Sequence, residues 1–240
     1  MNPAITIAKK EYSLAFRSVT TYIIFILFLT ATGFYFANTA LKVGLAELRG
    51  VFGIIHLIFV IYAPAITMSA ISKEQASGTF ELLSTLPLKL GQIVWGKIMA
   101  AVMLLATVLV FTLVYLGLIL HFGSGVDLGA IFAGYLGLLL AGAAYISIGV
   151  FASSLSTNQV LAFILGLAIS AVFYLMQFIT AFLPASLAGT LEFISFDYHL
   201  QNFLKGVIDT RDLLFFLILI VVFKYLAELK LQSRNMMQER

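Results

Sequence analysis

The sequence contains no cysteine and few charged residues, and both shortages narrow the choice of protein class. The absence of cysteine excludes disulfide bonds, thiolate chemistry and cysteine-ligated metals. Charged residues make up 10% of the 240 residues, whereas soluble domains contain about 25%. Hydrophobic residues reach 62% and the mean hydropathy is +1.07, which is too apolar for a fold surrounded by water. The composition excludes a cytosolic enzyme, a disordered chain and a disulfide-stabilised secreted domain, and it predicts a membrane protein.

Long apolar runs predict an all-α membrane protein with six transmembrane helices. A helix crosses the hydrocarbon core of a bilayer with about 20 mostly apolar residues. The connections between the runs are short, so residues 1–240 are expected to form one transmembrane domain. The predicted spans are Thr20–Thr39, Phe52–Ile71, Ile93–Leu120, Gly129–Ala152, Gln159–Leu183 and Leu213–Ala227.

The distribution of lysine and arginine predicts the orientation of the chain in the membrane. With the N-terminus inside, ten of the 14 basic residues lie in inside segments and four lie outside. Cytoplasmic loops carry an excess of lysine and arginine, so both termini are expected in the cytoplasm. The net charge of +3 reflects this bias and does not indicate a nucleic-acid partner.

Residues 2–17, which precede the first span, have the pattern of an interfacial helix. Pro3 suits the first position of a helix. At helical spacing the polar residues share one stripe, namely Thr6, Lys9, Lys10, Ser13 and Arg17. A second stripe is apolar and consists of Ile5, Ala8, Tyr12, Ala15 and Phe16. Such a helix lies along the membrane with its basic face toward lipid headgroups. The alternative is a solvated beginning of the first span.

The cytoplasmic loop between the second and third spans is predicted to contain a short helix at about Gly78–Thr85. Gly78 can cap this helix, Glu81 meets the positive end of its dipole, and Pro87 ends it. Three of its side chains are too apolar for a solvated loop, namely Phe80, Leu82 and Leu83. We therefore expect the helix to occupy a groove on a partner protein.

The segment from Gly91 to Lys97 matches most of a phosphate-binding loop. Such a loop requires a serine or threonine after the lysine to contact magnesium, but Ile98 stands there. The glycines also open a membrane helix and do not connect a strand to one. The segment does not predict nucleotide binding, and Lys97 is expected to extend toward the cytoplasmic interface.

The remaining polar residues predict caps and packing positions, with no metal or catalytic site. His56 has no acidic residue near it in its span, and His199 with Asp197 is too sparse a set for a metal. Asp197 is expected to cap a helix that Gly206 ends, and Asp209 to cap the last span. Small residues recur every four positions in the fourth and fifth predicted spans, which favours close helix packing. They are Gly129, Ala133, Gly137 and Ala141 in the fourth, and Ala162, Gly166 and Ser170 in the fifth.

Two motifs resemble the permease subunits of ABC-2 type ABC transporters. The first is Ser-Gly-Thr-x-Glu-Leu-Leu-x-Thr-x-Pro at 77–87, followed by Ile-Val-x-Gly-Lys at 93–97. The second is Asp-x-His-x-x-Asn-Phe-x-x-Gly-Val-Ile-Asp-x-Arg-Asp at 197–212. The layout of apolar runs agrees along the whole chain. Among the subgroups, the sequence is similar to the small permease associated with bacterial gliding motility.

The resemblance implies a membrane subunit that dimerises, with itself or a related permease, and works with a separate ABC ATPase. ATP and magnesium would bind the ATPase, and this chain would hold no cofactor, metal or catalytic residue. A second, smaller contact with the ATPase is implied at Ser153–Asn158, and the location would be the bacterial inner membrane. The residues implied to couple the two subunits are Gly78, Thr79, Phe80, Glu81, Leu82 and Leu83.

Two other functions remain open from the sequence. One is a secondary transporter, but such proteins place ionisable groups near the membrane midplane, and the predicted spans have almost no central charge. The other is a membrane scaffold that uses an ATPase to move a partner without transporting a cargo.

The predicted orientation can be tested with single cysteines, because the chain has none of its own. Ser84→Cys lies in the loop predicted inside, and Thr210→Cys lies in the segment predicted outside. An impermeant thiol reagent applied to intact cells should label position 210 and spare position 84. Labelling of position 84 from outside would reverse the orientation and separate the loop from a cytoplasmic ATPase.

Overall fold

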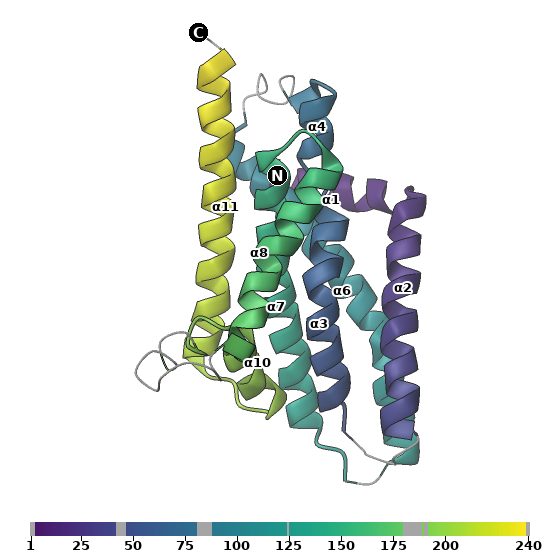
Figure 1. The fold of residues 1–240 in the computed structure, drawn as a ribbon. Coiled ribbons are helices and arrows are strands. Elements are labelled where there is room, and N and C mark those ends of the chain that lie inside the picture. Colours follow the sequence, from purple (N-terminus) through teal and green to yellow (C-terminus); the bar gives the residue numbers. More distant parts are fainter. Residues whose placement is uncertain are drawn as a thin grey trace.

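The computed structural model describes residues 3–41, 47–80, 88–123, 125–179, 189 and 192–238. Within these residues the regular elements are helices and no strand is present, which confirms the all-α class (Figure 1). The elements are α1 (Pro3–Ala15), α2 (Val19–Phe36), η1 (Ala37–Leu41), α3 (Arg49–Thr67), α4 (Ser72–Ala76), α6 (Leu90–Phe122), α7 (Leu128–Leu155), α8 (Gln159–Ile179), α10 (Phe196–Leu204) and α11 (Thr210–Gln238).

Five helices in the described part of the chain are long and apolar enough to cross a bilayer, namely α2, α3, α6, α7 and α8. They contain the first four predicted spans almost completely and the described part of the fifth. The sixth predicted span, Leu213–Ala227, lies within α11. This helix is less apolar because Lys224, Glu228 and Lys230 lie in its C-terminal half. Because α11 runs beside α7 along the bundle, it stays a predicted span (Figure 1).

The centre of the bundle is α7, which packs against α3, α6, α8, α10 and α11. In the most apolar stretch of α7, 78% of the residues are buried within the protein, compared with 17% in α8. The side chains of α8 therefore face mainly outward, where lipid would surround them. Helix α2 lies at the edge of the bundle, where it packs on α3 and α6 (Figure 1).

Glycines on α7 allow the neighbouring helices to approach closely. A Cβ atom at Gly137 would lie 2.5 Å from the Cβ of Phe203 on α10, and one at Gly134 would overlap the ring of Phe52 on α3. The predicted small-residue stripe on this helix thus serves contacts within one chain. On α8, the stripe containing Gly166 also faces inward, since Ala162, Gly166 and Ser170 are the buried residues of that helix.

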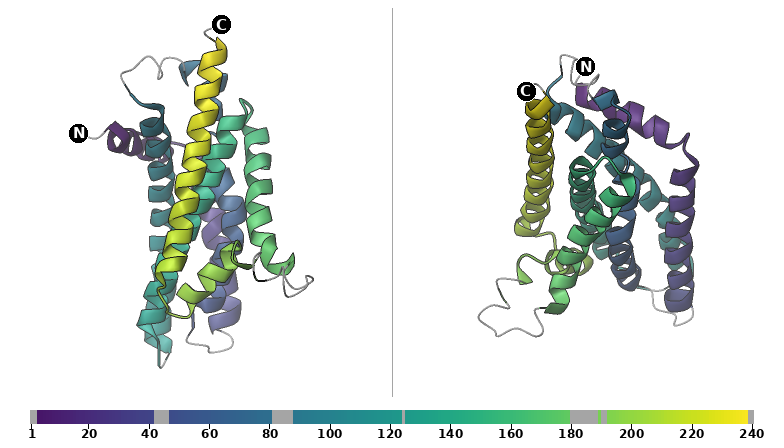
Figure 2. Two further views of the ribbon diagram at one scale, coloured as in Figure 1. Left: turned by 90° about the vertical axis from the view of Figure 1, so that its left-hand side faces the viewer. Right: turned by 45° about the horizontal axis from the view of Figure 1, so that its top comes forward.

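Helix α1 crosses one end of the bundle almost at right angles to the other helices (Figures 1 and 2). It packs on α6 through the buried residues Ala4 and Ala8, while Lys9, Lys10 and Arg17 are exposed. Gly96 permits this contact, because a Cβ there would lie 2.9 Å from the carbonyl oxygen of Ala4. The orientation and the exposed basic residues fit the predicted interfacial helix. Ile5 of the apolar stripe is 41% exposed and does not share in the burial of Ala4 and Ala8.

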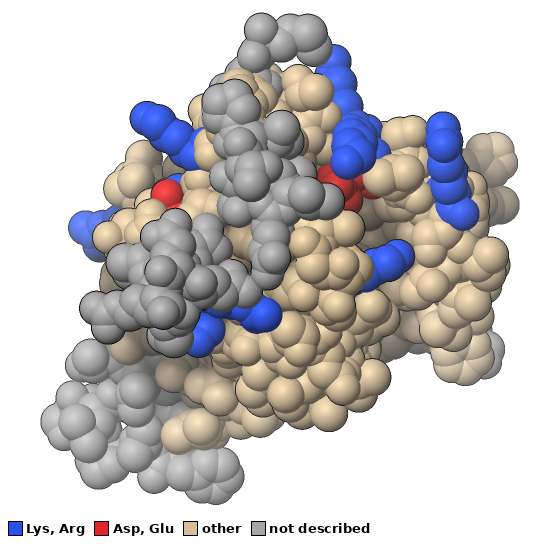
Figure 3. Space-filling model, turned by 90° about the horizontal axis from the view of Figure 1, so that it is seen from above, with Lys and Arg blue, Asp and Glu red and all other residues tan. Residues whose placement is uncertain are grey.

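Both termini lie at the end of the bundle that carries α1 and α4, hereafter the upper end (Figure 1). Seen from above, lysine and arginine side chains are spread around this end and outnumber the carboxylates (Figure 3). The described basic residues at the lower end are Arg49, Lys205 and Arg211. The basic residues therefore divide between the two ends as the sequence predicted.

One predicted helix cap differs from the structure, and another has a double position. Gly78, with φ +69°, follows the end of α4 and directly precedes Thr79 and Phe80, which are helical, so it separates the two helical segments. Helix α4 itself lies in a region that the sequence analysis treated as loop. The N-cap of α10 is Ser195, and Asp197 lies in its first turn. Gly206 follows the end of α10 with φ +84°, and Asp209 precedes α11, both as expected.

Gly137→Ala should destabilise the protein, because the new methyl group would overlap Phe203. Overpacking of this kind costs about 1–3 kcal/mol. The matched control is Gly117→Ala on α6, where a Cβ meets nothing within 4 Å. That change should be neutral or slightly stabilising, since alanine favours a helix by about 0.5–1 kcal/mol over glycine. Thermal unfolding in detergent would compare the two, and equal melting temperatures would contradict the packing described here.

Candidate functional site

The connection from α3 to α4 is fastened to the upper end of α7 by a buried serine. The hydroxyl oxygen of Ser153 accepts hydrogen bonds from the backbone N–H groups of Ile71 and Ser72, each at 3.0 Å. The same hydroxyl donates to the carbonyl oxygen of Met68 at 3.0 Å. These backbone groups lie between two helices and need a partner from elsewhere in the fold. One side chain on α7 therefore fixes the beginning of α4.

Gln75 extends this connection to α11. Its side-chain amide donates to the carbonyl oxygen of Ser154 at 3.4 Å, and its side-chain oxygen accepts from Arg234 at 3.0 Å. We call the set Ile71, Ser72, Gln75, Ser153 and Arg234 the α4 junction. It joins three segments that are far apart in the sequence. The loop that leads to the predicted coupling residues is thus held by two of the long helices.

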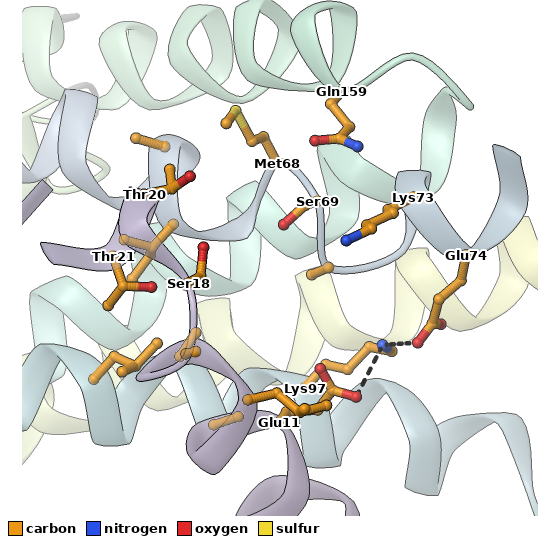
Figure 4. Close-up of a pocket in the computed structure, with 18 of the residues that line it drawn as sticks. Glu11, Ser18, Thr20, Thr21, Met68, Ser69, Lys73, Glu74, Lys97 and Gln159 are labelled. Carbon is orange, nitrogen blue, oxygen red and sulfur yellow. Dashed lines mark hydrogen bonds and ion pairs between the residues drawn. The ribbon is translucent and has the colours of Figure 1, made fainter. Parts of the chain in front are cut away.

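A buried lysine connects α6 to the same region. Lys97 is 4% exposed, and its ammonium lies 2.6 Å from a carboxylate oxygen of Glu74 on α4 and 3.9 Å from one of Glu11 on α1 (Figure 4). The expectation that Lys97 extends toward the interface is wrong. The two carboxylates give the ammonium a partner within the protein, which a buried charge requires. Glu74 and Glu11 join α4 and α1 to α6.

The predicted coupling residues are only partly described. Gly78 and Thr79 are exposed at the upper end, and the hydroxyl of Thr79 lies 2.8 Å from that of Ser77. Phe80 is 5% exposed and packs in the core of the chain. This packing gives the phenyl ring an apolar environment without any partner. The others, Glu81, Leu82 and Leu83, lie outside the described residues, as does Pro87.

The other implied contact region, Ser153–Asn158, reaches the same end of the molecule. Ser153 and Ser154 are buried in the α4 junction, whereas Asn158 is exposed and caps α8. Its side-chain oxygen accepts from the backbone N–H of Val160 at 2.8 Å. The structure therefore brings this turn and the loop after α3 together.

A cleft of about 660 Å³ opens beside these groups (Figure 4). It lies between α1, the beginning of α2, the end of α3, α4, α6 and the first residue of α8. Its walls include the charged groups Lys10, Glu11, Lys73, Glu74 and Lys97. Figure 4 shows the side chain of Lys73 reaching into the cleft, and the ion pairs of Lys97 forming one wall.

Polar side chains also meet near the lower end, around α10. His56 of α3 is 1% exposed, and its ring nitrogens lie 3.1 Å from the hydroxyl of Tyr145 and 4.0 Å from a carboxylate oxygen of Asp197. Burial raises the pKa of the Asp197 carboxyl above its usual value, and the hydrogen bond from Gln201 partly offsets this rise. The sequence gave no sign of this pairing, because 141 positions separate His56 from Asp197.

A second buried set lies between α10 and the first turn of α11. His199 contacts Asp212 at 2.6 Å through Nδ1 and the carbonyl oxygen of Phe193 at 2.8 Å through Nε2. Asn202 donates to the other oxygen of Asp212 at 2.9 Å. Both ring nitrogens lie within hydrogen-bond distance of an oxygen atom, and these contacts fasten α10 to α11. Among the described residues, no group of three potential metal ligands is present.

The sequence model of a family described as ABC-2 family transporter protein matches residues 5–239. The chain belongs to this family. The match covers nearly the whole length, which confirms the family predicted from the two motifs. No curated protein matches the chain. Proteins of the ABC-2 family are membrane components of transporters, and membership implies an ATPase partner in general.

The α4 junction lies directly before the motif at 77–87, one of the two motifs that resemble the ABC-2 family. It is at the end of the bundle that carries both termini and most basic residues. Sequence reasoning found the motif and, through the resemblance, the region Ser153–Asn158, but it missed Glu74 and the hydrogen bonds of Ser153. One signal for Glu74 existed, because a lysine within a membrane helix requires an anionic partner. No local pattern distinguishes Ser153 from other serines of its helix.

Ser153→Ala should loosen α4, because two buried N–H groups would lose their acceptor. Each unsatisfied group costs about 1–3 kcal/mol. Hydrogen exchange measured by mass spectrometry should become faster at Ile71 and Ser72. Ser147→Ala is the matched control, since this buried hydroxyl on α7 donates only to Ala143 in its own helix. Equal exchange at positions 71 and 72 in both variants would contradict the role of Ser153.

Proposed function

We propose that this chain is the transmembrane permease subunit of an ABC transporter. It would couple ATP hydrolysis in a separate ATPase subunit to the movement of a cargo across or out of the membrane. The chain itself would contribute no catalytic residue and no cofactor, because ATP and magnesium would bind the partner. The observation that carries the proposal is the α4 junction. A displacement of the segment at 77–87 would reach α7 and α11 through hydrogen bonds and α6 through the Lys97 ion pair.

The orientation and assembly follow from the same proposal. Both termini and the upper end would face the cytoplasm, in the bacterial inner membrane. The predicted coupling residues other than the buried Phe80, and the turn at Ser153–Asn158, would contact the ATPase. A second copy of the chain, or a related permease, would complete the transporter, and the gliding-motility subgroup stays a prediction. The outward-facing side chains of α2 and α8 leave surface for lipid or for such a copy.

The proposal predicts that ATPase activity belongs to a partner. The tagged chain, purified in mild detergent, should bring down an ATPase, and hydrolysis should disappear when the partner is removed. ATP hydrolysis by the chain alone would contradict the proposal that the ATPase site lies in a partner subunit.

Glu81→Lys tests the predicted contact more sharply. Reversing an interface charge should weaken association with the ATPase by about tenfold while leaving membrane insertion intact. Glu47→Lys is the matched control, because Glu47 is exposed at the lower end and undergoes the same reversal. Association and stimulated hydrolysis would be compared for both variants. Equal effects of the two reversals would place the contact elsewhere.

A further inference from the structure

The cleft at the upper end contains two cations without a partner. Lys97 is balanced by Glu11 and Glu74. Lys10 on α1 and Lys73 on α4 also line the cleft, and neither side chain forms an ion pair or hydrogen bond with a described residue. The charged side chains of the lining therefore leave a net positive charge, and Lys73 reaches into the space (Figure 4).

Hydroxyl groups add hydrogen-bond donors to the same space. Ser18, Thr20 and Thr21 come from the beginning of α2, and Ser69 from the end of α3. Their hydroxyls form no hydrogen bond with the rest of the described chain. Hydroxyl and ammonium donors around one space match an oxyanion such as phosphate, which carries several acceptor oxygens.

The lining becomes apolar with depth along three separate helices. On α2, Thr20 and Thr21 are followed one turn lower by Ile24. Ser69, in the connection after α3, lies above Ile66 of α3, and on α6 Leu104 lies about two turns below Lys97. A soluble anion needs only the polar part of such a cleft. A lipid needs both parts, since its headgroup is polar and its acyl chains are apolar.

We infer that the cleft binds an anionic phospholipid of the adjoining leaflet, with its phosphate between Lys10 and Lys73. The glycerol and the first methylenes of its chains lie against Ile24, Ile66 and Leu104. The lipid bridges α1 and α4, because each of these helices supplies one lysine. Its binding needs only the membrane-embedded chain and does not depend on an ATPase.

The test is equilibrium binding of radiolabelled dioleoylphosphatidylglycerol to the purified full-length chain in detergent. The double variant Lys10→Ala/Lys73→Ala should bind more weakly, by roughly fivefold per lysine removed. The matched control Lys9→Ala/Lys230→Ala removes the same charge from exposed positions outside the cleft, on α1 and α11, and should bind as the natural chain does. Lys10→Arg/Lys73→Arg should retain binding, and melting temperatures would verify that each variant is folded.

Two competitors distinguish the source of the phosphate group. Unlabelled phosphatidylglycerol should displace the label at far lower concentrations than inorganic phosphate or phosphatidylcholine. Displacement by inorganic phosphate at equal concentration would overturn the lipid assignment and indicate a site for soluble anions. Equal losses of affinity in the two alanine double variants would overturn the site itself, because general surface charge would then explain the binding.

Discussion

Close packing around α7 is the constraint on which the rest of the structure depends. Four glycines of this helix, at positions 134, 137, 142 and 149, face side chains from α3, α6 and α10. In a bilayer, helices gain little from hiding apolar surface from one another, so van der Waals contact at short range has to hold them together. The small residues allow that contact, and they leave α8 and α2 at the edge. The positions of the upper and lower polar groups follow from this arrangement.

The polar groups at the upper end then give α4 a defined position on the bundle. Burying Lys97 is costly unless it is paired, and its partners Glu11 and Glu74 come from α1, which packs on α6, and from α4. The hydroxyl of Ser153 forms hydrogen bonds with backbone groups of Met68, Ile71 and Ser72, which lie between α3 and α4 or at the start of α4. These contacts connect α4, and with it the loop that follows, to the long helices α6, α7 and α11. The cleft lies beside Lys97 and Glu74 of these contacts, which form part of its wall.

Particular elements show where reasoning from the sequence succeeded. Continuous apolar runs predicted the long helices, and the basic stripe before Thr20 predicted α1. Gly206 ended α10 as expected, because glycine readily adopts the left-handed conformation found there. The family was recognisable from local motifs. Asp197 shows the limit of this reasoning, since an acidic residue suits both the N-cap and the first turn of a helix, and only the backbone distinguishes the two.

The sequence by itself determined the helical class, the approximate span limits, the charge asymmetry and the family, because hydropathy, capping and motifs act over a few turns of chain. The tertiary structure alone decided which polar side chains meet. Lys97 with Glu74, Ser153 with Ile71, and His56 with Asp197 join segments that lie 23, 82 and 141 positions apart. No local pattern specifies such pairs, since they arise when small residues let particular helix faces come together. The cleft has the same origin, because six helices contribute to its walls.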